Sequence, residues 1–114
     1  MNMIESYGFG KMAVDGKRYG SDLIIFPDKV IPDWRRKEGH NLAIEDLTKV
    51  FEYGPEILVV GTGNIGMMKL PEETRKQITD NGIELVAEKT GKAYRSFNEL
   101  SKTRKVVGAF HLTC

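Results

Sequence analysis

One short apolar run, Ile57 to Val60, constrains the fold of this chain more than any other feature. Consecutive apolar residues without alternation are typical of a strand that is buried on both faces, so we predict a strand over Glu56–Val60. Apolar residues on either side of this run recur at helical spacing. Because parallel strands need long crossovers between them, this alternation predicts a sheet with helices on both faces.

The neighbouring segments carry the signals of helix boundaries. Apolar residues from Ile44 to Phe51 are spaced for one helical face, and Gly54 with Pro55 stops that helix. A second helix is expected to begin around Pro71. A third is expected to use Thr90 as its cap, with Ala93, Phe97 and Leu100 on one face. Strands over Ile83–Ala87 and Val106–Leu112 follow these two helices.

The first third of the chain has the patterns of strands. Lys11–Val14 and Lys17–Tyr19 flank Asp15-Gly16, a dipeptide that favours a tight hairpin turn. Further strands are expected over Asp22–Phe26 and, at a sheet edge, Val30–Trp34. The predicted fold is therefore α/β: a three-layer α/β/α sandwich with a mixed central sheet and an N-terminal antiparallel hairpin portion.

Length and charge narrow the class of protein. The 114 residues suit a single domain over 1–114, and 17 basic against 16 acidic residues exclude a strongly basic nucleic-acid binder. A single cysteine suits a reducing compartment. The N-terminus lacks the features of a signal peptide, and no apolar run approaches the roughly 20 residues of a membrane span. We therefore expect a cytoplasmic protein.

The loop after the predicted buried strand, Gly61 to Gly66, reads G-x-G-x-x-G. In dinucleotide-binding folds a helix begins at once after such a loop, whereas here Met67 to Leu70 intervene before Pro71. The loop is therefore interpreted as a tight turn or as a site for a smaller anion, with no cofactor predicted. Free backbone amides at Thr62, Gly63 and Asn64, with Lys69 nearby, would form a concave donor site for the anion. The ligand-binding candidates are Gly61, Thr62, Gly63, Asn64, Lys69 and His111.

The C-terminal segment supplies two candidate catalytic residues, His111 and Cys114. On one strand their side chains point to opposite faces, which disfavours a nucleophilic pair and favours a buried structural histidine. If the last strand lies beside Glu56–Val60, His111 approaches the glycine loop. Two histidines and one cysteine at scattered positions do not predict a metal site.

A tryptophan and several cations are clustered in the segment from Trp34 to His40. Such a cluster can hold a phosphate or stack on a base, but on a near-neutral chain it more often forms a solvated loop whose arginine stems cover apolar surface. We expect no nucleic acid here. The candidates for a partner surface are Trp34, Arg35, Arg36 and His40.

Four segments together are similar to one small family. They are Tyr7–Gly10, the loop that ends in Gly39-His40, Val59–Gly63 and the closing Phe110–Cys114. The family includes the mitochondrial complex I assembly factor 3, the adipogenesis-associated domain protein and uncharacterised prokaryotic homologues. The resemblance covers nearly the whole chain and implies a compact three-layer α/β domain. Its members are not established enzymes, and some act as assembly or accessory proteins that bind other proteins.

Two functions follow as expectations. The resemblance and the lack of a clear catalytic constellation favour a non-catalytic interaction or assembly module with a protein partner. The alternative is a protein that binds a small molecule or anion at Gly61–Gly66, an enzyme if His111 acts there as an acid–base group. The mitochondrial members carry a targeting extension that this sequence lacks, so the resemblance implies no role in complex I.

Overall fold

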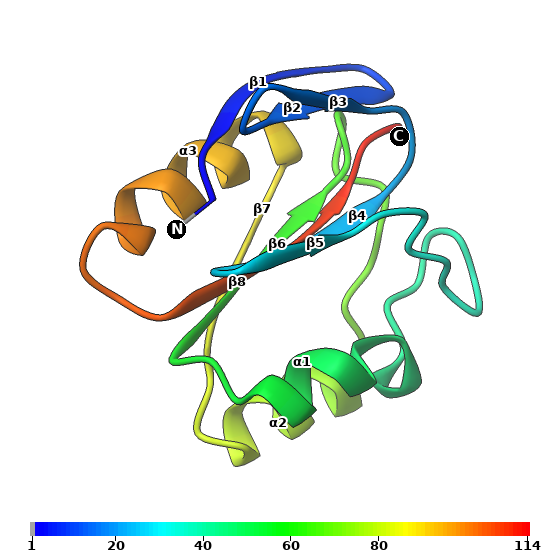
Figure 1. The fold of residues 1–114 in the computed structure, drawn as a ribbon. Coiled ribbons are helices and arrows are strands. Elements are labelled where there is room, and N and C mark those ends of the chain that lie inside the picture. Colours follow the sequence, from blue (N-terminus) through cyan, green and yellow to red (C-terminus); the bar gives the residue numbers. More distant parts are fainter. Residues whose placement is uncertain (1) are drawn as a thin grey trace.

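The computed structural model describes residues 2–114, which form two β-sheets and three α-helices (Figure 1). A short 3₁₀ helix, Ile44–Leu47, precedes the first α-helix. The strands are β1 (Ile4–Gly8), β2 (Lys11–Val14), β3 (Lys17–Tyr19), β4 (Leu23–Phe26), β5 (Lys29–Ile31), β6 (Ile57–Thr62), β7 (Glu84–Glu88) and β8 (Val106–His111). The helices are α1 (Thr48–Tyr53), α2 (Glu72–Asp80) and α3 (Thr90–Ser101).

The central sheet has the strand order β5-β4-β8-β6-β7. Strand β6 pairs in parallel with both β7 and β8, while β4 pairs antiparallel with β8 and β5. The sheet is therefore mixed, and β6 lies in its interior as its apolar run predicts. Strand β5 is an edge strand, and it ends at Ile31, directly before Pro32.

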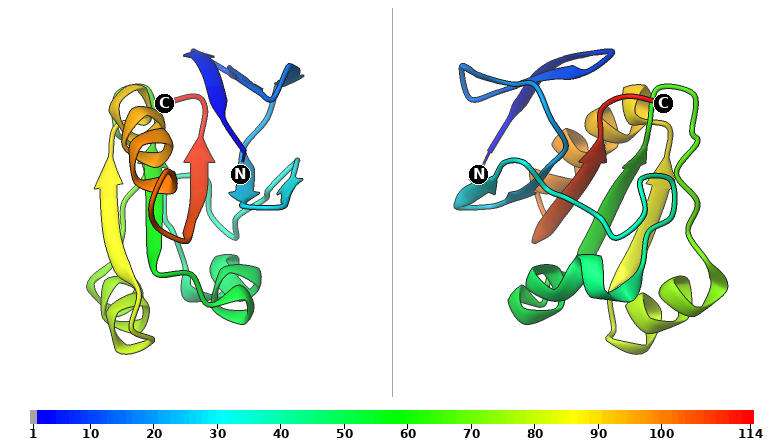
Figure 2. Two further views of the ribbon diagram at one scale, coloured as in Figure 1. Left: turned by 60° about the vertical axis from the view of Figure 1, so that its left-hand side comes forward. Right: turned by 90° about the vertical axis from the view of Figure 1, so that its right-hand side faces the viewer.

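Side chains on alternate positions of the central strands divide between two apolar clusters. Leu58 and Val60 pack with the side of the sheet that carries α1 and α2, whereas Ile57 and Val59 pack with α3. The helices thus cover both faces of the sheet, which confirms the three-layer arrangement (Figure 2). Each fully buried Leu, Ile or Val side chain contributes about 1.5–3 kcal/mol to the free energy of folding.

The N-terminal strands form a second sheet of their own, in the order β1-β2-β3. It lies in the same layer as α3 and contributes Ile4, Met12 and Val14 to that cluster. The sequence pattern does not predict the bounds of β1. A bulge between Ile4 and Ser6 interrupts its register with β2, and this irregularity hides the alternation of buried and exposed residues.

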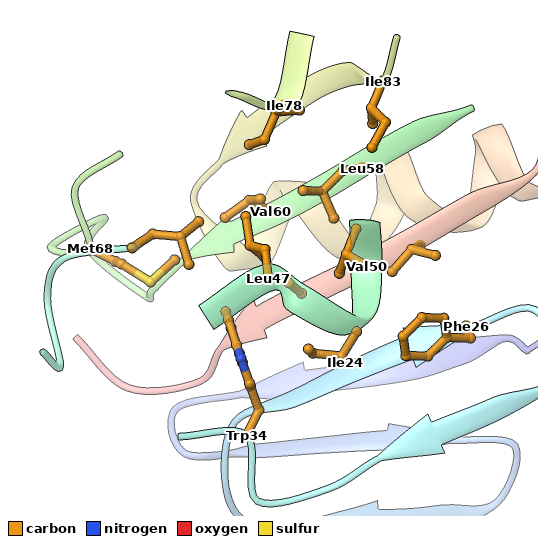
Figure 3. Close-up of a cluster of buried hydrophobic side chains, with 13 residues drawn as sticks. Ile24, Phe26, Trp34, Leu47, Val50, Leu58, Val60, Met68, Ile78 and Ile83 are labelled. Atoms are coloured by element: carbon orange, nitrogen blue, oxygen red, sulfur yellow. The ribbon is translucent and has the colours of Figure 1, made fainter. Parts of the chain in front are cut away.

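The other cluster lies between the central sheet and the helices α1 and α2 (Figure 3). Leu47 and Val50 project from the 3₁₀ helix and α1 toward Leu58 and Val60 of β6. Met68, from the loop after β6, fills one end of the cluster and is buried. The helical pattern between Ile44 and Phe51 is therefore confirmed, although its first turn is 3₁₀.

Thr90 does not cap α3. Lys89 is the N-cap residue of this helix, and no side chain makes a capping hydrogen bond there. The Thr90 side chain is instead fully buried, and its hydroxyl group accepts a hydrogen bond from Gly63 and donates one to the carbonyl of His111. Among residues 2–114, no helix has the length and apolar character that crossing a bilayer requires.

Candidate functional site

The site lies at the carboxyl ends of β6 and β8, which run side by side in parallel. Thr62 at the end of β6 is in register with His111 at the end of β8. The glycine loop that follows β6 and the residues that follow β8 therefore meet at one edge of the sheet. Strand β4 runs antiparallel to β8, and its start places Asp22 at the same edge.

Asp22 connects β4 to the end of β8. One carboxylate oxygen, Oδ1, accepts a hydrogen bond of 2.8 Å from the backbone N–H of Leu112. The other, Oδ2, lies 2.7 Å from His111 Nδ1 and 2.8 Å from Arg36 Nη1. Both oxygens are thus committed within the protein, and we call Asp22, Arg36 and His111 the buried polar cluster.

Arg36 brings the loop between β5 and the 3₁₀ helix into this cluster. Its side chain is only 5% exposed, and its Nε and Nη2 donate hydrogen bonds to the carbonyl oxygen of Gly39. The guanidinium group also lies 4.8 Å from the centroid of the Trp34 ring. Because a buried cation needs compensation, the ion pair with Asp22 explains why Arg36 can point inward.

The partners of His111 determine its tautomer. Arg36 Nη2 also approaches His111 Nδ1, at 3.1 Å, but arginine has no acceptor and the Asp22 carboxylate has no proton to donate. We therefore assign a proton to Nδ1, which donates to Asp22. The other ring nitrogen, Nε2, is buried and has no hydrogen-bond partner among residues 2–114. The ring of His40 lies edge-on to that of His111, with 5.7 Å between centroids.

Two opposing effects act on the pKa of Asp22. Burial alone would raise this pKa, but the hydrogen bonds from His111 and Leu112 and the charge of Arg36 stabilise the carboxylate. The net effect lowers the pKa of Asp22 below its ordinary value of 3.8. Asp22 therefore stays ionised and keeps the imidazole of His111 oriented.

The glycine loop differs from the expected cradle of free amides. The N–H of Gly63 donates to the Thr90 hydroxyl at 2.9 Å, and the N–H of Asn64 donates to the carbonyl of Thr113 at 2.6 Å. The N–H of Met67 donates to the carbonyl of Cys114 at 2.9 Å. The expectation of free Gly63 and Asn64 amides is thus corrected: the C-terminal segment and Thr90 occupy the positions that an anion would take.

Close packing holds the loop against β8 and α3. A Cβ atom on Gly63 would collide with the backbone of Cys114 and would lie 2.8 Å from His111 Cδ2. The Thr90 hydroxyl accepts from Gly63 and donates to the carbonyl of His111 at 2.6 Å. A Cβ atom on Gly61 would lie 2.7 Å from the Thr90 hydroxyl oxygen and 2.8 Å from Phe110 Cδ1. The glycines of this loop therefore permit the backbone to pack against its neighbours.

The remaining ligand candidates have different surroundings. The hydroxyl of Thr62 donates to the carbonyl of Glu88, and the backbone of Lys69 pairs with His40 and Leu42. Cys114 is a free, partly exposed cysteine, and no hydrogen bond joins its thiol to His111 among the described residues. Within residues 2–114, no three His, Cys, Asp or Glu side chains are grouped so that they could hold a metal ion.

The predicted partner-surface residues divide into two pairs. Trp34 is buried, and its indole N–H donates to the carbonyl of Asp46 at 3.0 Å. The Arg36 side chain is buried by the ion pair described above. The expectation that these two lie on a partner surface is therefore corrected, since packing and charge pairing draw both inward. Arg35 and His40 are exposed.

Sequence reasoning misses Asp22, Arg36 and Thr90 as partners of His111 and the glycine loop. The patterns place Asp22 in a strand, Arg36 on a surface and Thr90 at a helix cap. The sequence signal that could have found Asp22 is its position directly before the apolar run Leu23–Phe26, because a buried charge needs a partner. One partner, His111, is 89 positions away in the sequence.

Three large apolar side chains remain exposed around this edge of the sheet. They are Phe9 in the turn between β1 and β2, 60% exposed, with Ile65 and Met67 in the glycine loop, 61% and 42% exposed. The C-terminal segment lies between these two turns, because Gly10 bonds to Leu112 and Asn64 bonds to Thr113. We call Phe9, Ile65 and Met67 the exposed apolar rim.

Solved structures of similar proteins share this fold. A conserved hypothetical protein from Pyrococcus horikoshii OT3 is 29% identical, with 97% of this chain and 98% of that chain covered and a TM-score of 0.83. A protein described as an outer membrane protein from Bartonella henselae is 27% identical, with 97% and 94% covered and a TM-score of 0.82. A Mth938-like domain from Bordetella pertussis, 22% identical with 97% and 85% covered and a TM-score of 0.79, shares the fold.

A family model described as a protein of unknown function, DUF498/DUF598, matches residues 4–111. That range runs from the first residue of β1 to the last residue of β8, and so includes the buried polar cluster and the glycine loop. With nearly the whole chain matched, the protein belongs to the DUF498/DUF598 family.

Proposed function

We propose that this chain is a non-catalytic protein-interaction module of the assembly-factor type, and that it binds its partner with the exposed apolar rim. The observation that carries the proposal is the exposure of Phe9, Ile65 and Met67 in two turns that both bond to the C-terminal segment. Exposed apolar side chains that form a patch favour contact with another protein. Arg35 and His40, which are also exposed, supply charged and polar groups for the same contact.

The rigidity of this edge supports a recognition surface. Hydrogen bonds from Asn64 to Thr113, from Met67 to Cys114 and from Gly10 to Leu112 hold both turns against the C-terminal segment. A surface held in place in this way loses little conformational entropy when a partner binds. Arg35 and Thr113 line a common depression of about 310 Å³, so the exposed cation lies beside the C-terminal segment.

The experiment is a quantitative pull-down from native extract with the full chain as bait. We compare the wild type with a double variant, Phe9→Ser and Ile65→Ser, and with Met3→Ser as the control. Met3 is also an exposed large apolar residue, 37% exposed, but lies outside the rim. Urea unfolding first verifies that all three proteins fold with similar stability.

We expect a reproducible protein partner with the wild type and with Met3→Ser, and its loss with the rim variant. Equal recovery of the partner by all three proteins would show that the exposed apolar rim does not bind it. Failure to recover any reproducible partner would argue against an interaction module as a whole.

A second candidate function, the binding of a small molecule or anion near the Gly61–Gly66 loop, is favoured by one observation. The Nε2 atom of His111 is buried without a hydrogen-bond partner among residues 2–114, while Nδ1 is oriented by Asp22 as in the histidine of a general base. A nuclear magnetic resonance titration with nucleotides and phosphorylated metabolites tests it. Saturable shifts at residues 61–69 and 111 that disappear in His111→Gln would support it, and unchanged signals there would leave it without support.

A further inference from the structure

We propose that the outer face of the three-stranded sheet binds the phosphate group of a phosphomonoester. This face belongs to β1, β2 and β3 and lies at the outside of the molecule (Figure 1). It carries a depression of about 270 Å³ that is lined by Ser6, Tyr7, Gly8, Lys11, Met12, Ala13 and Arg18. We call this depression the sheet groove, and it is separate from the buried polar cluster.

The register of the strands places these residues on one face. Met12 and Val14 of β2 are buried toward the core, so the alternate residues Lys11 and Ala13 point outward. Gly8 pairs with Lys11, and Ala13 pairs with Ser6 on β1 and with Arg18 on β3. The outer face therefore carries Lys11 on the middle strand and Arg18 on β3, with small residues beside them.

Gly8 shapes the groove through its lack of a side chain. A Cβ atom at this position would lie 3.0 Å from Cε of Lys11, so the lysine side chain extends across the glycine. The stem of Lys11 therefore runs over β1, while the residue still lines the groove together with Arg18 of β3. Lys11 and Arg18 occupy diagonal positions on neighbouring strands, a spacing of roughly 7–8 Å between backbones that long side chains bridge.

The donors of the groove are not used within the protein. Across residues 2–114, no ion pair or hydrogen bond involves the side chains of Ser6, Lys11 or Arg18. The two acidic side chains nearest in sequence have other partners: Glu5 accepts from the N–H of Gly16, and Asp15 accepts from the N–H of Met3. The groove thus carries two cationic side chains and a hydroxyl group that make no ion pair or hydrogen bond within residues 2–114.

The number and geometry of the donors define the class of ligand. Two positive charges match the charge of a phosphomonoester, which is close to −2 at neutral pH, whereas a carboxylate would leave one cation unmatched. The planar guanidinium group of Arg18 suits two oxygens of one phosphate, and Lys11 supplies a point charge to a third. The same group occurs on soluble metabolites and on the headgroup of phosphatidic acid.

The test is a nuclear magnetic resonance titration of the ¹⁵N-labelled full chain at low ionic strength. The probes are glucose 6-phosphate, succinate as a dianion without phosphate, and vesicles of phosphatidylcholine with and without phosphatidic acid. The variants are Lys11→Ala and Arg18→Ala, with Lys17→Ala as the control. Lys17 carries the same charge on β3, but its ammonium group lies 5.4 Å from the Tyr19 ring centroid and does not line the groove.

We expect saturable shifts at residues 6–18 with glucose 6-phosphate, and about tenfold weaker binding in each groove variant, as the loss of one charge-assisted hydrogen bond implies. Lys17→Ala should retain the wild-type affinity. Binding to phosphatidic acid vesicles alone would assign the groove to the lipid-borne phosphate. Equal binding of succinate, an equal effect of Lys17→Ala, or the absence of saturable binding to any probe would overturn the proposal.

Discussion

Gly63 lies where the glycine loop, the C-terminal segment and β8 meet. Its φ of +112° belongs to a region that residues with side chains rarely adopt, and a Cβ atom there would collide with the backbone of Cys114. We expect Gly63→Ala to lower the free energy of unfolding by at least about 3 kcal/mol, because strain and collision add. Urea unfolding measures this loss.

Gly82→Ala is the matched control for that variant. Gly82 also has a positive φ, +74°, but no neighbouring atom lies within 4 Å of the position that a Cβ atom would take there. Strain alone should cost this control about 1 kcal/mol. Equal losses in the two variants would show that the crowding around Gly63 is not what determines its identity.

Asp22 makes the stability of the protein depend on pH. Its pKa is lower in the folded state than its ordinary value of 3.8, so the unfolded chain takes up a proton at a higher pH than the folded protein does. The stabilisation from Asp22 is therefore fully present above the unfolded pKa and is lost as the pH falls through the folded pKa. Acid should weaken the contact between β4 and β8 in this way.

Asp22→Asn tests this dependence. At neutral pH the variant leaves Arg36 buried without its counter-ion, and we expect a loss of about 3 kcal/mol in the free energy of unfolding. The difference between wild type and variant should shrink below about pH 4, where the wild-type carboxylate also becomes neutral. Thermal unfolding measured over that range checks it, and a difference that stays constant down to acid pH would contradict the assignment.

At the scale of elements, Asn98 of α3 covers the free edge of β1. Its side-chain amide donates to the carbonyl of Ile4 at 2.8 Å and accepts from the N–H of Ile4 at 3.0 Å. These two bonds replace those of a neighbouring strand and leave that part of the edge closed to other chains. The N-terminal sheet is thus joined to α3 by polar contacts as well as by the apolar cluster.

Asn98→Ala should therefore destabilise the N-terminal sheet. The buried backbone groups of Ile4 lose both partners, which corresponds to about 1–3 kcal/mol. Amide hydrogen exchange should accelerate in β1 more than in β6. Glu99→Ala, an exposed neighbour on the same helix, is the control and should change stability by less than about 0.5 kcal/mol. Unchanged exchange in β1 would show that Asn98 does not hold this edge.

The elements with local signals are those that the sequence can predict. The apolar run at Ile57–Val60 and the Asp15-Gly16 turn depend on residues close in sequence, and both appear as expected. Strand β1 escapes prediction because its bulge breaks the alternation. The role of Thr90 escapes it because the same residue type caps helices, and its hydroxyl here bonds to Gly63, 27 positions away.

In the candidate site, too, the features that can be predicted are those with a local signal in the sequence. The meeting of His111 with the glycine loop is predictable, since parallel neighbouring strands end at the same edge of a sheet. The pairing of Asp22, Arg36 and His111 is not, because it joins three segments whose proximity only the folded chain establishes. That pairing also explains why Arg36, expected at the surface, lies inside.

Across the molecule, the glycine loop is bonded to the C-terminal segment and to Thr90 of α3, and we propose that these bonds make it a rigid part of the partner-binding surface. Hydrogen exchange of the amides of Gly63, Asn64 and Met67, followed by nuclear magnetic resonance with and without added phosphate, tests this proposal. We predict slow exchange at all three amides and no change in their signals with phosphate. Fast exchange, or phosphate-dependent shifts at these amides, would contradict the claim and indicate an open anion site.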